Sequence, residues 1–181
     1  FTTTSRPAWR SRPSPPKPSP TEPIDYHLYG PALSIEVVGD PIGQGRISFM
    51  GKGRPAVHSN RKTLLPWRDL IAAVAHNAKS GAPQRLGGWP LDGPVGLHLH
   101  FTVKKPSGSP KTRRAFPSKR PDLSHYVRAA EDALQAAGIF KDDAQIVELL
   151  ATKAYPGEHV HSLDVPGLVA RVYTVGVPDA S

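Results

Sequence analysis

The sequence predicts an α/β (α+β) fold, in which a single domain consists of one mixed β-sheet with two main helices packed on it. Four apolar segments have the length or the alternation of β-strands, and two longer segments carry apolar residues at helical spacing. In chain order the elements are a strand, a hairpin, a helix, a strand, a helix and two further strands. A chain of 181 residues has room for one such hydrophobic core but not for two.

Residues 1–32 are expected to form a disordered arm, and residues 33–177 the folded domain. The arm is dominated by Pro, Ser, Thr and Arg and has too few apolar residues to bury a core. We prefer an unstructured leader over a basic arm that follows DNA. The β-branched run Leu33–Val38 predicts the first strand, and residues 47–58 predict a hairpin around the turn Gly51–Gly53.

A long helix is expected to follow the hairpin. Either Ser59 or Thr63 can cap its start, and Ser80-Gly81 provides its stop. Its apolar stripe consists of Leu64, Trp67, Ile71, Val74 and Ala78. Because Trp67 lies in this stripe, we interpret it as a core residue and not as a platform for stacked bases.

The next predicted strand leads into a basic loop. Apolar residues alternate strictly from 95 to 103, which predicts a half-buried strand with His98, His100 and Thr102 on its opposite face. Residues 104–119 form a loop rich in Pro, Ser and Gly, together with basic residues.

Asp122 is expected to cap the second helix, and Gly138 to end it. The apolar stripe of this helix consists of Leu123, Val127, Ala130, Leu134 and Ala137. Residues 146–155 and 168–175 predict the last two strands.

The composition favours a nucleic-acid partner. The formal net charge is +8 and the isoelectric point is near 9.9, and neutralised phosphates supply most of the non-specific affinity for DNA. The absence of cysteine excludes disulfides, thiolate zinc sites and a cysteine nucleophile. Because no signal peptide or membrane span is recognisable, we expect a soluble cytoplasmic protein associated with the nucleoid.

Acidic residues are scarce in this chain, yet six of them gather in one segment. They are Asp122, Glu131, Asp132, Asp142, Asp143 and Glu148. The stretch just before them, residues 94–121, has no acidic residue but carries Lys104, Lys105, Lys111, Arg113, Arg114, Lys119 and Arg120. A carboxylate cluster beside a basic segment is typical of a metal-dependent enzyme that acts on a polyanion.

The second helix provides one polar face for such a site. His125, Arg128 and Asp132 lie three and four residues apart along it, away from the apolar stripe. Converging carboxylates bind Mg²⁺, and a bound metal can generate hydroxide and stabilise charge on a phosphodiester. From the residues alone, an equally good interpretation is a helix cap, a solvated helix face and a turn.

This segment resembles the signature of RusA-type Holliday-junction resolvases. That signature runs Asp-Leu-Asp-Asn, then Lys, then Asp-Ala-Leu, then Gly, then Asp-Asp-x-Gln-Val/Ile. With the same spacing, this chain has Asp122-Leu123-Ser124-His125, Arg128, Asp132-Ala133-Leu134, Gly138 and Asp142-Asp143-Ala144-Gln145-Ile146. The resemblance extends over residues 34–175 and includes the upstream segments 41–46 and 53–55.

The resemblance implies a Mg²⁺-dependent endodeoxyribonuclease, with Mn²⁺ as a substitute ion, that cleaves branched DNA as a homodimer in recombination and repair. It implies that Asp122 and Asp143 hold the metal, that Asp142 or Asp132 completes or supports the site, and that Arg128 contacts the phosphate.

Three positions depart from the family pattern. Ser124 replaces the middle carboxylate, Arg128 the catalytic lysine, and His125 the asparagine. Asp132, Asp142 and Glu148 are the local candidates for the missing carboxylate.

Further residues are expected to contact DNA. They are Arg46, Lys52 and Arg54 around glycine turns, and Lys111, Arg113, Arg114, Lys119 and Arg120 in the basic loop. The histidine pairs His98/His100 and His159/His161 are interpreted as strand-face and loop residues and not as metal ligands. A non-catalytic binder of branched DNA with a degenerate metal site remains an alternative, as does a less selective metal nuclease. The sequence leaves open whether the gene belongs to a host or a phage.

Overall fold

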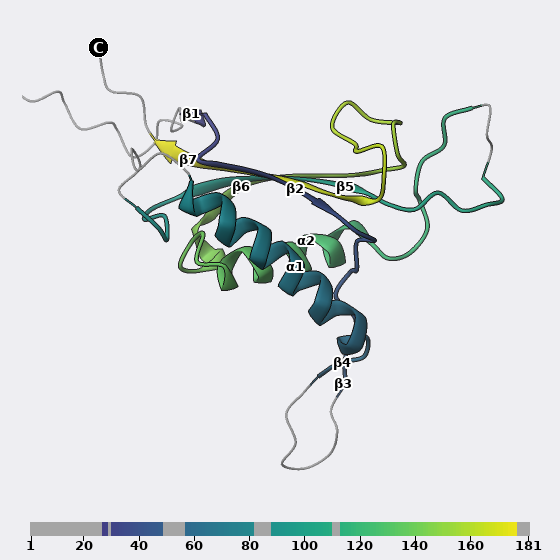
Figure 1. Cartoon of the computed structure of the whole chain (residues 1–181), viewed down its shortest axis with the longest axis horizontal. Helices are drawn as coiled ribbons and strands as arrows, with labels where there is room; N and C mark the ends of the chain where they lie inside the picture. The colour runs from purple at the N-terminus through teal and green to yellow at the C-terminus, as the bar shows by residue number, and fades with distance from the viewer. Residues whose placement is uncertain (1–26, 29, 49–56, 82–87, 110–112, 177–181) are drawn as a thin grey trace, which may run out of the picture.

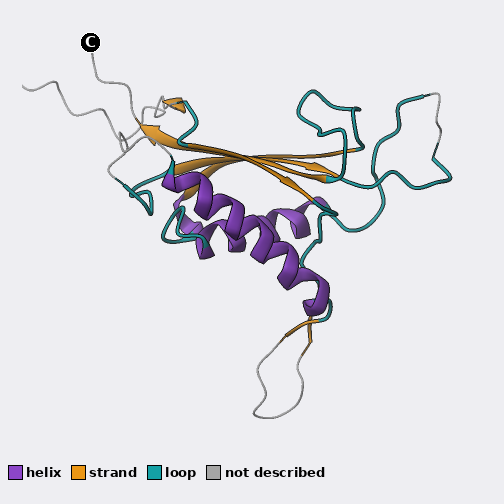
Figure 2. Ribbon diagram, in the orientation of Figure 1, coloured by secondary structure: helices purple, strands orange, loops and turns teal. Residues whose placement is uncertain are grey.

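The computed structural model confirms the predicted fold, a mixed β-sheet with both helices on one of its faces (Figures 1 and 2). The structure describes residues 27–28, 30–48, 57–81, 88–109 and 113–176. Residues 1–26, which make up most of the expected arm, lie outside the described residues, and so does the hairpin turn with Lys52 and Arg54.

The sheet follows the order β1-β7-β5-β6, and β2 pairs with β7 beside β1. Its strands are β1 (His27–Leu28), β2 (Leu33–Val38), β5 (Val95–Thr102), β6 (Ile146–Ala154) and β7 (Gly167–Gly176). Among the described pairs of strands only β5 and β6 are parallel, and the chain between them passes through the second helix, as a parallel connection requires. β1 falls within the segment that the sequence assigned to the arm.

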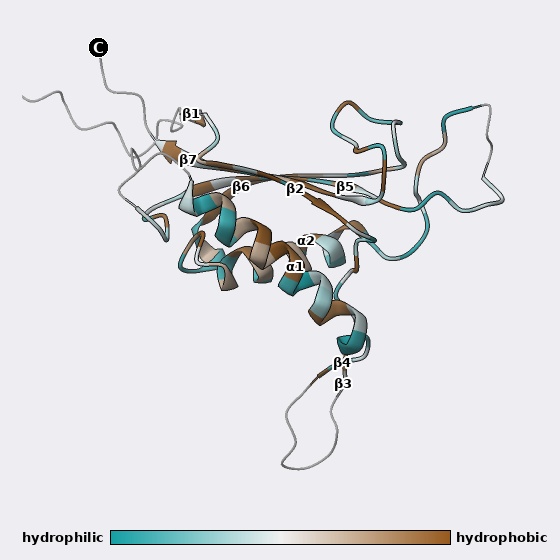
Figure 3. Ribbon diagram, in the orientation of Figure 1, coloured by the Kyte–Doolittle hydropathy of each residue, from teal (hydrophilic) through white to brown (hydrophobic). Residues whose placement is uncertain are grey.

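Two helices cover one face of the sheet, α1 (Arg61–Ser80) and α2 (Leu123–Ala136). Figure 3 shows their apolar sides turned towards the strands. The core between them includes Ile35, Trp67, Ile71, Leu97, Leu99, Phe101, Val127, Leu134 and Ala170. Trp67 is 4% exposed and belongs to this core, which confirms its interpretation as a core residue.

The start of α1 differs from the prediction. Its N-cap position is occupied by Asn60, not by Ser59 or Thr63. The Asn60 side chain does not cap the helix, because it is hydrogen-bonded to the segment around Gly45. Gly81 is the C-cap residue, as the sequence indicated.

β5 is buried on both faces, which corrects the prediction of a half-buried strand. His100 and Thr102 are 2% and 0% exposed, because residues 155–166 fold across the helix-free face of the sheet (Figure 1). The Leu163 backbone N–H donates to Thr102 Oγ1 over 2.9 Å, and the rings of His100 and His161 lie 4.3 Å apart. A polar strand face therefore became part of the interior.

The predicted hairpin is present as β3 (Ile47–Ser48) paired with β4 (Val57–His58). It projects from the start of α1, away from the sheet (Figure 1). None of the described helices is long and apolar enough to cross a membrane.

Burial of His100 makes the stability of the protein depend on pH. Burial is the largest cause that lowers the pKa of His100, from 6.5 to about 4. Coulombic effects of His161, Arg171, His159 and His98 lower the pKa of His100 further. The unfolded chain therefore binds more protons between about pH 4 and pH 6.5, so stability is fully present above this window and is lost as the pH falls through it.

Acidification from pH 7 to pH 5 is expected to lower the free energy of unfolding by about 2 kcal/mol through His100 alone. Urea titration of the native protein and of His100→Gln at both pH values measures this difference. The variant should lose about 2 kcal/mol less than the native protein on acidification. His76→Gln, at an exposed position of α1, is the control and should keep the native pH dependence. Equal losses in all three proteins would contradict the assignment.

Candidate active site

The site lies where the segment 41–46 packs on the N-terminal half of α2. The backbone N–H of Gln44 donates to the carbonyl of His125 over 2.8 Å. A side chain at Gly43 would place its Cβ 3.1 Å from the Cβ atoms of both His125 and Pro121. The sequence suggested a glycine turn before Arg46, but this segment instead runs against α2, and the missing side chain at Gly43 allows that close approach.

Asn60 holds the same segment from the side of α1. Its Oδ1 accepts from the Gly45 N–H over 2.9 Å, and its Nδ2 donates to the Gly43 carbonyl over 2.8 Å. A Cβ at Gly45 would collide with Asn60 Oδ1, so the contact requires glycine.

Asp132 connects three elements of the site. Gln44 Nε2 donates to its Oδ2 over 3.1 Å, and Arg68 of α1 forms a salt bridge with the same oxygen at 3.1 Å. Gln44 Nε2 also lies 3.1 Å from Nε2 of His58. The Asp132 carboxylate thus has protein partners from α1 and from the segment 41–46. Neither Gln44 nor Arg68 was recognised from the sequence as part of the site.

A cleft of about 560 Å³ opens beside these contacts. It is lined by Gln44, Gly45, Ile47, His58, Ser124, His125, Arg128 and Asp132. The structure therefore brings the family-like positions of α2 together with the hairpin and the glycine segment.

Arg128 joins two carboxylates at the edge of this cleft. Its Nη1 lies 3.0 Å from Asp143 Oδ2 and 4.0 Å from Glu131 Oε2. Asp143 belongs to the short 3₁₀ helix η2 (Asp143–Gln145) that follows α2. The pairing places Asp143 next to the second turn of α2, although 15 residues separate it from Arg128.

Glu131 lies beside Arg128, and the sequence analysis counted it in the acidic segment without naming it as a candidate site residue. Its side chain is only 12% exposed, and burial raises the pKa of its carboxyl, with Asp143 and Asp132 acting in the same direction and Arg128 opposing them. The sequence feature that could have indicated Glu131 is its position three residues after Arg128, on the same face of the helix as Ser124.

Asp122 occupies the N-cap position of α2, but its side chain makes no capping hydrogen bond. It is exposed, and within the described residues its carboxylate has no hydrogen bond or salt bridge. Asp122 thus occupies the expected N-cap position without capping the helix by a hydrogen bond. Its carboxylate oxygens remain available to a ligand.

The other acidic residues have different surroundings. Asp142 Oδ1 accepts from the Ala144 N–H over 2.8 Å and forms a capping box with Gln145, so it stabilises the start of η2. Glu148 lies 3.1 Å from Nε2 of His98 on the helix-free face of the sheet, opposite α2. Among the described residues, no group of three or more His, Asp and Glu side chains is arranged to hold a metal ion.

The predicted DNA-binding residues divide between two places. Arg46 is exposed and directly follows the glycine segment, while Arg113, Arg114, Lys119 and Arg120 are exposed in the basic loop. Arg114 donates to the carbonyl of Glu158, which ties this loop to residues 155–166. Lys111 lies outside the described residues, as do Lys52 and Arg54.

The fold and the site define a small α+β protein with carboxylates and a guanidinium grouped around a cleft at the start of one helix. The chain belongs to the endodeoxyribonuclease RusA family. The model of this family matches residues 39–162, which are more than half of the chain. The family comprises endodeoxyribonucleases that act on DNA junctions. The chain is also similar to the uncharacterized protein YqaN of Bacillus subtilis (strain 168), with 27% identity over 136 residues, which cover 70% of this chain and 89% of YqaN.

Replacing Asp142 by Ala is expected to lower the free energy of unfolding by about 1 kcal/mol, because the start of η2 loses its cap. Thermal or urea unfolding measures this change. The matched control is Asp164→Ala, at an exposed position of the 155–166 loop, where a surface substitution should change stability by less than about 0.5 kcal/mol. Equal stability of the two variants would show that the cap contributes nothing.

Proposed function

We propose that this protein is a Mg²⁺-dependent, structure-selective endodeoxyribonuclease that cleaves Holliday junctions or other branched DNA in recombination and repair. The observation that carries the proposal is the pairing of Arg128 with Asp143 beside the cleft, next to the start of the helix that presents Asp122. This arrangement combines oxygen donors for a metal with a cation for a phosphate.

Asp122 and Asp143 are the residues that would hold Mg²⁺. Carboxylate oxygens are the ligands that Mg²⁺ prefers, and this ion usually binds one or two carboxylates and keeps several waters. A site without three converging carboxylates is therefore still compatible with it. When bound, the ion supplies an activated water and stabilises charge on the phosphodiester.

Arg128 would bind and orient the phosphate. A guanidinium presents planar donors that match two phosphate oxygens, whereas it cannot donate a proton at neutral pH. Its salt bridge with Asp143 holds the guanidinium at the edge of the cleft before DNA arrives. Its part is thus recognition and electrostatic stabilisation, and not proton transfer to the leaving oxygen.

Glu131 would compensate for Ser124. The serine removes one negative charge from the family pattern, and a hydroxyl is a weak ligand for Mg²⁺. Of the carboxylates considered, Asp132 pairs with Arg68, Asp142 caps η2, and Glu148 lies on the other face of the sheet. Glu131 lies near the same guanidinium of Arg128 as Asp143. It would therefore add a negative charge on the side of α2 where Asp143 lies.

A homodimer would suit the substrate. The four strands of a four-way junction are related in symmetric pairs, and a protein with closed two-fold symmetry presents two equivalent sites to one such pair. We therefore propose that two copies of this chain act together on branched DNA.

Asp122→Asn and Asp143→Asn should each abolish Mg²⁺-dependent cleavage of a synthetic four-way junction while leaving junction binding nearly intact. The amide keeps the shape of the side chain but loses the charge that holds the ion. Gel analysis of nicked strands measures cleavage, and fluorescence anisotropy in Ca²⁺ measures binding.

Asp164→Asn is the matched control for these variants, because its carboxylate is exposed in the 155–166 loop. It should cleave like the native protein. Full activity of both site variants would refute the site. Junction binding by a native protein that never cleaves would identify a non-catalytic binder.

Glu131→Gln should raise the Mg²⁺ concentration for half-maximal cleavage about tenfold, equivalent to about 1.4 kcal/mol. The physical reason is the loss of one negative charge beside the ion. Folding should tolerate the change, because burial already disfavours the charged form of this side chain. Adding Ser124→Asp to this variant should restore much of the lost affinity.

Two measurements accompany this test. Thermal unfolding against Mg²⁺ concentration reports ion binding without cleavage, since a ligand of the native state raises its stability. Glu36→Gln on the exposed face of β2 is the control and should leave both readouts unchanged. If Glu131→Gln behaves like this control, Glu131 is not part of the metal site.

A further inference from the structure

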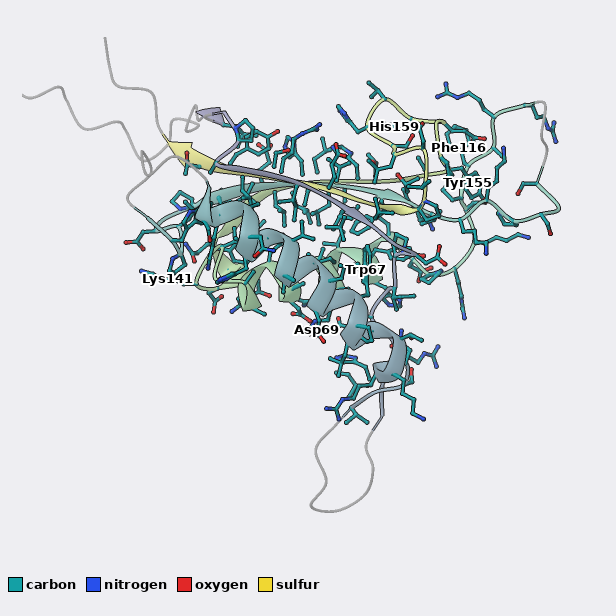
Figure 4. The ribbon with its side chains drawn as sticks, in the orientation of Figure 1. Trp67, Asp69, Phe116, Lys141, Tyr155 and His159 are labelled. Atoms are coloured by element: carbon teal, nitrogen blue, oxygen red, sulfur yellow. The ribbon has the colours of Figure 1, made fainter. Side chains whose placement is uncertain are left out.

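A second cleft opens at the start of α2, beside the candidate active site. It has a volume of about 280 Å³ and shares no lining residue with the first cleft. Its walls come from Asp40 and Pro41, from both ends of the basic loop, and from the end of β6 with Tyr155. Figure 4 shows Tyr155 and Phe116 at one end of the molecule and Lys141 at the other.

The two clefts lie on different sides of the first turns of α2. Ser124, His125 and Arg128 line the first cleft, whereas Pro121 and Tyr126 line the second. Asp122 directly follows Pro121 and is exposed. A strand of nucleic acid that crosses the start of α2 would therefore pass from one cleft to the other over Asp122.

The charge of the second cleft favours an anion. Four cationic side chains line it, and they are Lys104, Lys119, Arg120 and Lys153. Asp40 is the single carboxylate residue among its described lining residues.

Lys153 is fixed in this cleft by two hydrogen bonds and has a third N–H donor. Its Nζ donates to the carbonyls of Lys119 and Pro121 over 3.0 and 2.9 Å, which fixes the turn that leads to Asp122. An ammonium group has three N–H donors, so one remains for a ligand.

Two tyrosines add neutral donors. Tyr126 and Tyr155 are only 4% and 6% exposed, yet both line the cleft. Within the described residues, neither hydroxyl has a hydrogen-bond partner in the protein, and the one buried side-chain polar atom without a partner belongs to Trp67. Their hydroxyls thus keep access to the solvent of the cleft, although the rings are buried.

We propose that this second cleft binds a phosphodiester of the DNA strand, next to the one that is cut. This inference rests on the proposed function and adds a subsite to it. Lys104, Lys119 and Lys153 hold the phosphate by charge, and Tyr155 donates a hydrogen bond. A contact of this kind carries no sequence information, but it fixes the strand so that its neighbouring phosphate meets Arg128 and Asp143.

The test is the salt dependence of binding, measured by fluorescence anisotropy with a labelled four-way junction in Ca²⁺ and without cleavage. Lys104→Gln and Lys119→Gln should each weaken binding several-fold and reduce the slope of log affinity against log salt, in total by no more than about 0.9 because the subsite holds one phosphate. Tyr155→Phe should weaken binding without changing the slope, because the lost donor is neutral. Lys141→Gln is the matched control, since this exposed lysine pairs with Asp92 far from the cleft and should leave both quantities unchanged.

The outcomes separate the subsite from the proposed function. If the native protein binds the junction but the two lysine variants keep its slope and affinity, the subsite is wrong while the nuclease proposal stands. If the expected slopes are found and no cleavage occurs in Mg²⁺, the subsite stands and the nuclease proposal fails. Absence of junction binding in the native protein overturns both.

Inorganic phosphate, tested at constant ionic strength by thermal unfolding, should stabilise the native protein far less than the junction does. Equal stabilisation would identify a site for free phosphate and overturn the DNA assignment.

Discussion

The close approach of residues 43–45 to α2 is the constraint on which the site depends. Gly43 lets the backbone reach His125, Gly45 lets it reach Asn60, and Asn60 then holds this segment from the start of α1. The Gln44 side chain extends from this contact to Asp132, which Arg68 binds from the other side. α1, α2 and the hairpin are thus fixed relative to one another by polar contacts around one cleft. A side chain at Gly45 would push these elements apart and widen the cleft.

The acidic segment divides into structural and exposed groups once its partners are known. Asp132 and Asp142 satisfy fixed donors, since one binds Arg68 and the other caps η2. Within the described residues Asp122 has no such partner, and the side chain of Asp143 is paired with the exposed Arg128 alone. A carboxylate that is already paired loses those contacts when it moves to a metal, whereas an unpaired one does not. The electrostatics therefore favour the start of α2 as the place where an ion and a phosphate meet.

The two faces of the sheet have opposite characters. The helix-covered face is apolar and positions α2 through ordinary packing (Figure 3). The other face is polar and partly closed by residues 155–166, where Glu158 binds Lys105 and the Ala115 N–H of the basic loop. This contact fixes one wall of the second cleft, because the same loop continues to Lys119 and Arg120. The helix-free face thus contributes to the site indirectly, by holding the basic loop in place.

The sequence by itself determined both main helices, the hairpin and four of the five strands of the sheet, in their order. Leu33–Val38 follows from its β-branched residues and the stripe from Leu64 to Ile71 from a period of 3.6 residues, both of which depend only on local geometry. The matched spacing from Asp122 to Ile146 also indicated the family before any contact was known. Tertiary structure alone decided which side chains meet across the chain. The pairing of Asp132 with Arg68, the role of Asn60 and the burial of His100 all depend on elements that are separate in sequence, and no local pattern specifies them.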